Sequence, residues 1–140
     1  MVAAVIRRDE RVLLCRRPAH KRHGGLWEFP GGKLATGETL GEAAARELTE
    51  ELGVRLTGLG RHLGSRRDPG AAFEIHFVEV HAEGEPSSLE HDEVAWVEAG
   101  RVLSYRLAPG DRAFAEAWTG GEADRTAPPA GGRAPRAAEP

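Results

Sequence analysis

The sequence predicts an α/β protein in which a mixed β-sheet is sandwiched between helices, an α/β/α arrangement. Two short β-type runs, Val2–Ile6 and Val12–Arg16, begin the chain. A helix with clear start and stop signals covers Thr39–Leu52, and an alternating apolar run, Ala72–Ala82, follows it. Strands on both sides of a helix favour layers of helix packed on a sheet.

The strands are predicted from short apolar runs bounded by turn residues. The first two runs are joined by the charged turn Arg7–Arg11 and are typical of a hairpin. In Ala72–Ala82, Phe73, Ile75 and Phe77 alternate with other residues, as expected for a half-buried strand. The remaining expected pieces are a short extended segment Leu26–Phe29, a strand Val54–Leu63, a turn Ser65–Gly70 and a last strand Val94–Glu98.

The first helix is bounded by recognisable capping residues. Thr39 and Glu42 match a capping box, in which each side chain accepts a hydrogen bond from the other residue's backbone N–H. Gly53, just after Leu52, is the residue expected for a left-handed helix stop.

A second helix is predicted over Pro109–Trp118, with Phe114, Ala117 and Trp118 on one face. Beyond it the chain contains mostly Gly, Pro, Ala and charged residues, a composition that buries little apolar surface. We therefore expect one folded domain over residues 1–118 and a disordered C-terminal tail over residues 119–140.

Composition narrows the functional classes. The 140 residues carry a formal net charge of −3, so no overall basic field favours a nucleic-acid polymer. No run approaches the roughly 20 apolar residues of a membrane span, and the apolar start is too short for a signal peptide. We expect a cytoplasmic protein without a membrane partner, either a monomer or a homodimer.

Cysteine and histidine do not suggest a zinc site. The one cysteine, Cys15, lies in an apolar run and is expected to be a buried thiol. His20 and His23 share a basic loop. The other four histidines, His62, His76, His81 and His91, are scattered along the chain.

The first helix carries an unusual group of carboxylates. At about 100° per residue, Glu47, Glu50 and Glu51 fall within roughly a 100° arc that borders the apolar stripe ending at Leu52. Anions held together at the edge of a core repel one another and attract a cation. Oxygen ligands suit Mg²⁺, with Mn²⁺ as a second possibility. The alternative is a solvated acidic patch that pairs with Arg46.

The spacing around these glutamates matches a known motif. Gly32 and Glu38 are followed, after seven residues, by the run RELTEELGV that begins at Arg46. This pattern resembles the Nudix box without a mismatch, and the whole of residues 1–118 resembles the MutT group of Nudix hydrolases. The segments that carry the wider resemblance are GGLWEFPGGK, EGEPSSLEHDEVAWV and LAPGDRAF.

The resemblance implies an Mg²⁺-dependent enzyme that cleaves a nucleoside triphosphate into a nucleoside monophosphate and pyrophosphate. Its implied metal ligands are the carboxylates of Glu47, Glu50, Glu51 and Glu90 and the backbone carbonyl of Gly31. Glu93 competes with Glu90 for the same role.

The resemblance also implies catalytic roles beyond metal binding. Arg46 would orient the neighbouring carboxylates, with Glu38 in support where loop and helix meet. Either Glu47 or Glu50 would take a proton from the attacking water.

Substrate contacts implied by the resemblance are Arg17 and Lys33 toward phosphate, and Phe29 and Asp111 toward the base. Phe29 could equally belong to the core, and Asp111 could cap the second helix. MutT-type enzymes that take oxidised guanine have an asparagine where this chain has Asp111. An ionised aspartate only accepts hydrogen bonds, whereas asparagine also donates them.

Three functions follow from the resemblance. The first is sanitation of modified nucleotides such as 8-oxo-dGTP. The second is hydrolysis of CTP or 5-methyl-dCTP, which an aspartate in place of asparagine favours. The third, from a different class, is a non-catalytic nucleotide-binding Nudix module, although such a module would be expected to have lost box glutamates.

Overall fold

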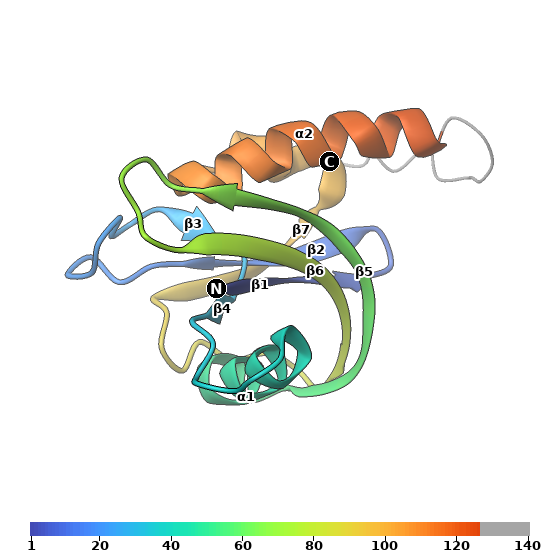
Figure 1. Cartoon of the computed structure of the whole chain (residues 1–140). Helices are drawn as coiled ribbons and strands as arrows, with labels where there is room; N and C mark the ends of the chain where they lie inside the picture. Colours follow the sequence, from blue (N-terminus) through green and yellow to red (C-terminus); the bar gives the residue numbers. More distant parts are fainter. Residues whose placement is uncertain (127–140) are drawn as a thin grey trace.

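A seven-stranded mixed sheet lies between two helices, α1 and α2, in the computed structural model, which describes residues 1–126 (Figure 1). Its main path has the order β3-β2-β1-β6-β5; β4 pairs with β1, and β7 pairs with β2. β1 and β6 are parallel, and the other described pairs are antiparallel. The elements are β1 (Val2–Arg8), β2 (Arg11–Arg16), β3 (Trp27–Glu28), β4 (Gly31–Gly32), α1 (Leu40–Leu52), β5 (Arg55–Arg67), β6 (Glu74–Glu83), β7 (Glu93–Glu98), the 3₁₀ helix η1 (Ala99–Ser104) and α2 (Pro109–Thr126).

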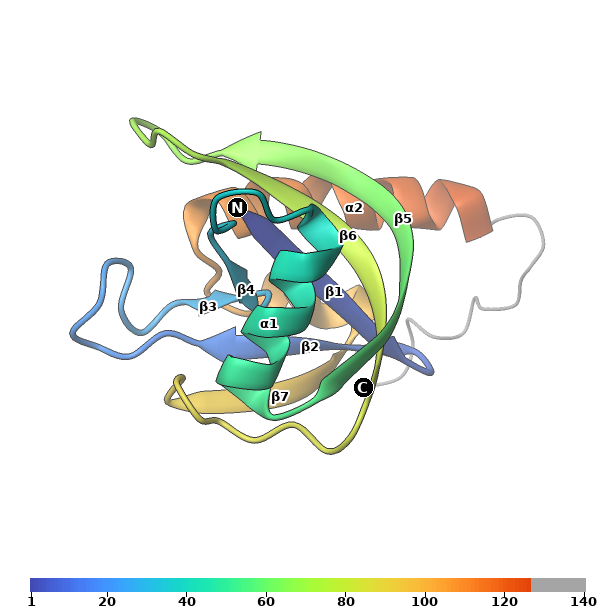
Figure 2. The same cartoon turned by 60° about the horizontal axis from the view of Figure 1, so that its bottom comes forward.

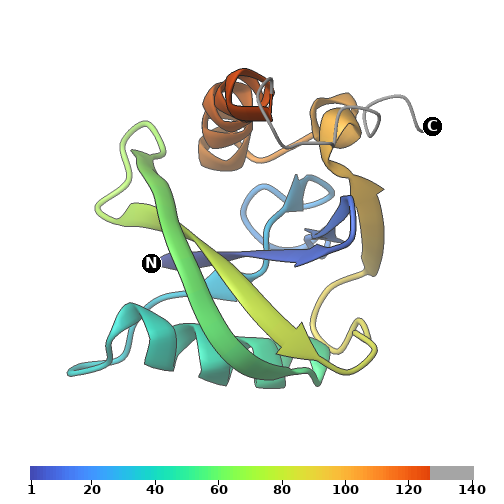
Figure 3. The same ribbon diagram turned by 90° about the vertical axis from the view of Figure 1, so that its right-hand side faces the viewer.

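The strands present alternate residues to the two helices, because successive side chains on a strand point to opposite faces. In β1, Val2, Ala4 and Ile6 belong to the core on the α1 side. Ala3 and Val5 join the core on the other side, which includes Phe114 and Trp118 of α2. The view in Figure 3 shows the two helices on opposite sides of the strands. The predicted α/β/α layering is confirmed.

The predicted start and end of the first helix are also confirmed. Thr39 is the N-cap of α1, and its hydroxyl oxygen accepts a hydrogen bond from the Glu42 backbone N–H. The Glu42 carboxylate accepts one from the Thr39 N–H, which completes the capping box. Gly53 ends the helix with φ at 72°. Residues such as Ala44, Leu48 and Leu52 are buried against the sheet, which α1 crosses in Figure 2.

Several predicted boundaries were wrong. β5 continues through the expected turn to Arg67, because antiparallel pairing with β6 holds it as far as Glu74. Phe73 precedes β6 and remains 45% exposed, although its spacing suggested a buried position. The 3₁₀ helix η1 was not predicted.

The second helix is longer than expected and ends at Thr126, so residues 119–126 are helical. The composition of residues 119–140 suggested a tail that does not fold, and each glycine costs a helix about 1 kcal/mol. Extending an existing helix is much easier than starting one, so a helix can pass through such a cost. Residues 127–140, the rest of the expected tail, lie outside the described residues. No described helix is long and apolar enough to cross a membrane.

Candidate active site

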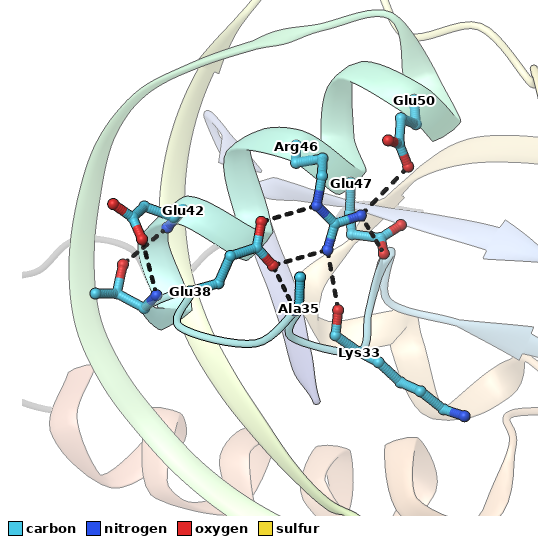
Figure 4. A network of polar contacts seen from close by, with 8 residues as sticks. Lys33, Ala35, Glu38, Glu42, Arg46, Glu47 and Glu50 are labelled. Carbon is cyan, nitrogen blue, oxygen red and sulfur yellow. Dashed lines mark hydrogen bonds and ion pairs between the residues drawn. The ribbon is translucent and has the colours of Figure 1, made fainter.

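Arg46, in the middle of α1, is the centre of a polar network that joins the helix to the loop before it (Figure 4). Its guanidinium holds the Glu38 carboxylate at two points, Nε to Oε2 at 2.8 Å and an Nη to Oε1 at 2.9 Å. The same group donates to the Lys33 carbonyl oxygen at 3.0 Å. It also donates to Glu47 at 3.1 Å and to Glu50 at 3.4 Å. The predicted orienting role of Arg46 has a physical basis in these contacts.

In this network the positive charge of Arg46 is balanced by the carboxylates that it contacts, above all that of Glu38. Hydrogen bonds from Arg46 and from the Ala35 backbone N–H lower the pKa of Glu38 to about 2. The same pairing raises the pKa of Arg46 above its already high value. Glu38 therefore stays ionised at any physiological pH and ties the loop 33–38 to α1.

Glu47 and Glu51 form a second, contrasting group on the same helix. The Glu51 carboxylate contacts that of Glu47 and accepts a hydrogen bond from the Gly31 N–H at 3.3 Å. Glu51 is only 8% exposed. A Cβ atom at Gly32 would overlap the Glu47 carboxylate, so a larger residue there would displace that side chain. The glycine loop and the glutamates are thus fitted to each other.

The environment of Glu51 favours its neutral form. Burial, the neighbouring Glu47 and the charge of Glu28 together raise the pKa of Glu51 to about 9. A buried carboxyl beside another carboxyl gives up its proton when a cation takes the proton's place. Glu47 and Glu51 therefore have the chemistry of ligands for a hard cation such as Mg²⁺.

Glu50 is placed differently from the other two motif glutamates. Its side chain is half exposed and contacts Arg46. It does not line the pocket that contains Glu47 and Glu51. Among the described residues, no group of three or more His, Cys, Asp and Glu side chains is arranged to hold a metal ion. The structure thus brings Glu47 and Glu51 together but not Glu50.

A pocket of about 400 Å³ connects most of the predicted site residues. Its lining combines carboxylates, cations, backbone glycines and apolar side chains. The predicted residues in it are Arg17, Phe29, Gly31, Lys33, Glu47, Glu51, Glu90 and Asp111. Lys21, Glu28, Ile75 and His91 also line it. A cavity of this size and mixed polarity is typical of small-molecule sites.

Glu28 and His91 are site residues that sequence analysis missed. An Arg17 Nη donates to Glu28 Oε1 at 3.0 Å, and His91 Nε2 lies 3.0 Å from Glu28 Oε2. The His91 side chain is 5% exposed. Its Nδ1 is buried with no hydrogen-bond partner among the described residues. A carboxylate between two aromatic residues in a short apolar segment was the available signal for Glu28.

Phe29 and Asp111 lie next to each other in the lining of the pocket. Phe29 is a core residue, 3% exposed, with its ring edge-to-face against Phe77 and Phe114. Its backbone N–H donates to Asp111 Oδ2 at 3.0 Å. Asp111 lies in the first turn of α2, and burial together with the charge of Glu28 raises its pKa well above the ordinary value. The buried Asp111 therefore favours its neutral form.

The remaining predicted residues in the pocket lining are Arg17, Lys33 and Glu90. The Lys33 ammonium lies 4.5 Å from the centroid of the Phe73 ring. Arg17 Nε donates to the Arg22 carbonyl oxygen at 2.6 Å, which fixes the basic loop. Glu90 lines the pocket, whereas its competitor Glu93 pairs with Arg16 at 3.2 Å.

Comparisons with known proteins agree with this geometry. The model of the NUDIX domain matches residues 1–118. CTP pyrophosphohydrolase of Escherichia coli K12 is 38% identical over 130 residues, covering 91% of this chain and 96% of that protein. An 8-oxo-dGTP diphosphatase of Proteus vulgaris is 50% identical over 46 residues, covering 33% of this chain and 41% of that protein.

The fold comparison points to the same group. The solution structure of the E. coli ORF135 protein superposes with a TM-score of 0.73 at 39% identity, covering 93% of this chain and 92% of that one. The pocket, the glycine loop and the glutamate helix thus occur within a domain that matches along nearly its whole length. The chain belongs to the Nudix family and is a hydrolase of nucleotide phosphoanhydride bonds.

Proposed function

We propose that this Nudix hydrolase converts nucleoside triphosphates to nucleoside monophosphates and pyrophosphate, with Mg²⁺ as its metal and Mn²⁺ as a substitute. The observation that carries the proposal is the shared pocket. It joins the paired carboxylates Glu47 and Glu51 to Asp111 and the Phe29 backbone. One cavity thereby offers a metal-binding region and a region able to hydrogen-bond a base.

Charges around the pocket suit a triphosphate. Arg17, Lys21 and Lys33 line it and supply cations that attract phosphate oxygens. Arg17 is held by Glu28 and by the Arg22 carbonyl, so it is pre-positioned rather than free to sample many rotamers. We assign Arg17 and Lys33 to phosphate binding.

Glu47 and Glu51 would hold the metal, with the Gly31 carbonyl and Glu90 as further ligands. Bound there, Mg²⁺ would neutralise phosphate charge and lower the pKa of a bound water. Arg46 fixes Glu47 from the other side, at 3.1 Å. Glu50, which contacts Arg46 and stays half exposed, would serve as the proton acceptor or as an additional ligand.

The first candidate substrate is an oxidised guanine nucleotide such as 8-oxo-dGTP, with a role in cleaning the nucleotide pool. A neutral Asp111 both donates and accepts hydrogen bonds, which restores the pattern of an asparagine. Its raised pKa supports that neutral form. The Proteus vulgaris relative carries the corresponding name.

The second candidate is CTP or 5-methyl-dCTP. An aspartate at position 111 favours it, since a carboxylate oxygen can accept a hydrogen bond from the exocyclic amino group of cytosine. The E. coli relative named CTP pyrophosphohydrolase covers more of the chain than the Proteus relative does.

The test is pyrophosphate release with Mg²⁺ across 8-oxo-dGTP, dGTP, CTP, 5-methyl-dCTP and dATP. We expect turnover of at least one nucleotide, and loss of turnover in Glu50→Gln. Glu85→Gln, at a side chain that is 80% exposed, is the matched control and should remain active. Release of orthophosphate would contradict the cleavage position. Tight nucleotide binding without any turnover would instead support the non-catalytic module.

A further inference from the structure

Two histidines outside the nucleotide pocket lie against each other on the sheet. His62 Nε2, on β5, is 2.9 Å from His76 Nδ1, on β6. The ring centroids are 5.2 Å apart, and the ring planes are inclined by 56°. His62 is exposed, and the His76 side chain retains 33% exposure. Ions in solution can therefore reach both rings.

Strand register explains why two residues far apart in sequence meet here. His62 is the register partner of Val78, and His76 is the partner of Ser65. Val78 belongs to the core on the α1 side, so His62 and His76 stand on that face as diagonal neighbours. Irregular register on both sides of His62 sets its position on β5.

A carboxylate stands behind one of the two rings. Glu74 Oε1 lies 3.4 Å from His76 Nε2, on the side of the ring away from His62. Glu74 is itself fixed, since its Oε2 accepts a hydrogen bond from the Ser65 hydroxyl at 3.1 Å. A carboxylate that holds the distal nitrogen of a histidine is the usual support of a metal-binding imidazole.

We propose that His62 and His76 form a two-nitrogen site for a late divalent transition metal, with Cu²⁺ the preferred ion. The 2.9 Å separation places both ring nitrogens within reach of one ion once the proton of their hydrogen bond is displaced. Square-planar and tetragonal geometry with imidazole ligands is typical of Cu²⁺ and Ni²⁺, and Cu²⁺ binds more tightly.

Proton positions agree with this assignment. When His76 keeps its proton on Nε2, toward Glu74, its Nδ1 presents a lone pair to the ion. Without metal, one of the two facing nitrogens carries the proton of their hydrogen bond. On metal binding that proton leaves, and His62 binds through Nε2 with its remaining proton on Nδ1. No third His, Cys, Asp or Glu ligand gathers there among the described residues, and water would complete the coordination.

This site differs in kind from the nucleotide pocket. The pocket offers oxygen ligands for a hard cation, whereas the histidine pair offers nitrogen ligands on strands β5 and β6. An ion bound by both rings would crosslink these two strands, and an ion that binds only the folded chain raises the melting temperature.

The test is a Cu²⁺ titration of the full chain in excess Mg²⁺, followed by electron paramagnetic resonance and thermal unfolding. We expect one equivalent of Cu²⁺ with hyperfine splitting from two imidazole nitrogens and a raised melting temperature. His62→Asn and His76→Asn should each abolish that signal, while Glu74→Gln should weaken binding by about tenfold. His81→Asn, an exposed histidine elsewhere on β6, is the matched control and should retain the site.

Folding of each variant is checked by its unfolding transition without copper and by Mg²⁺-dependent nucleotide hydrolysis, which His62→Asn should leave intact. A spectrum with oxygen ligands alone would overturn the proposal. So would binding that His62→Asn and His76→Asn leave unchanged in folded protein.

Discussion

Carboxylates in two regions beside and on helix α1 have opposite environments: Glu38 is paired with Arg46, whereas Glu51 is buried against Glu47. On one side, Arg46 satisfies Glu38 at two points and holds the pKa of Glu38 near 2. On the other side, Glu51 is buried against Glu47, and its pKa rises to about 9. The first arrangement fixes a loop to a helix within the protein itself. The second crowds two carboxylates together, which is the arrangement that the proposed metal site requires.

The largest expected effect on catalysis comes from neutralising Glu51, which is buried against Glu47. Glu51→Gln keeps the shape of the side chain but removes a charge that would balance Mg²⁺. We expect kcat for pyrophosphate release to fall by on the order of 10³-fold, within the range of a lost catalytic group. Steady-state kinetics at saturating Mg²⁺ measures this change in kcat. The control is Glu116→Gln, at an exposed side chain of α2. Near-normal kcat would remove Glu51 from the metal site.

A change at Arg46, which pairs with Glu38, should reduce activity less than the change at Glu51. Arg46→Lys keeps the positive charge but cannot reproduce the fork that holds Glu38 while also reaching Glu47. We expect activity to fall by about 10- to 100-fold, the range seen when supports of metal ligands are removed. Arg112→Lys, which alters an exposed helix pair, is the control and should change activity little. If Arg46→Lys matched Glu51→Gln in activity loss, Arg46 would act directly on substrate rather than through Glu47.

Stability should show the same contrast through pH. Glu51 has a raised pKa in the folded state, so the folded protein binds more protons than the unfolded chain between the ordinary carboxyl pKa and about 9. Without metal, wild-type stability should fall as pH rises through this window. Glu51→Gln lacks that group and should keep a flatter profile, so its melting temperature should exceed that of wild type by several degrees near pH 8.

Thermal unfolding from pH 5 to 9 in the presence of a chelator measures the difference. Added Mg²⁺ should reverse it, because the ion stabilises wild type more than the variant. Parallel profiles for the two proteins would contradict a buried, protonated Glu51.

The same contrast explains what the sequence could predict. The Thr39–Glu42 capping box and the Gly53 stop depend on neighbours within a few residues, and both were predicted correctly. The three glutamates lie on α1, as expected, but only Glu47 and Glu51 line the pocket. Glu50 contacts Arg46 outside it. This difference depends on how α1 packs against β4, which helix periodicity cannot predict. The contact between Glu28 and His91 was not predicted, because the two residues are 63 positions apart and meet only through tertiary packing. The pairing of His62 with His76 required the β5–β6 register in the same way.

The smallest expected effect on rate concerns Asp111, another buried acid, whose raised pKa favours its neutral form. If Asp111 is protonated in the folded protein, Asp111→Asn removes no charge, and the free energy of unfolding should change by less than about 1 kcal/mol. This contrasts with the few kcal/mol that an unpaired buried charge would involve. The Phe29 N–H can still donate to the amide oxygen, so kcat on the best substrate should stay within about threefold.

The change should appear in base preference, because an amide always presents a donor, whereas a carboxyl can switch between donor and acceptor. We expect kcat/KM to shift by about tenfold toward 8-oxo-dGTP relative to CTP, a difference typical of one altered hydrogen bond. The ratio of the two values in each protein is the measurement. Unchanged preference would assign Asp111 to anchoring the Phe29 backbone at the start of α2, and the base would then be recognised by other groups in the pocket.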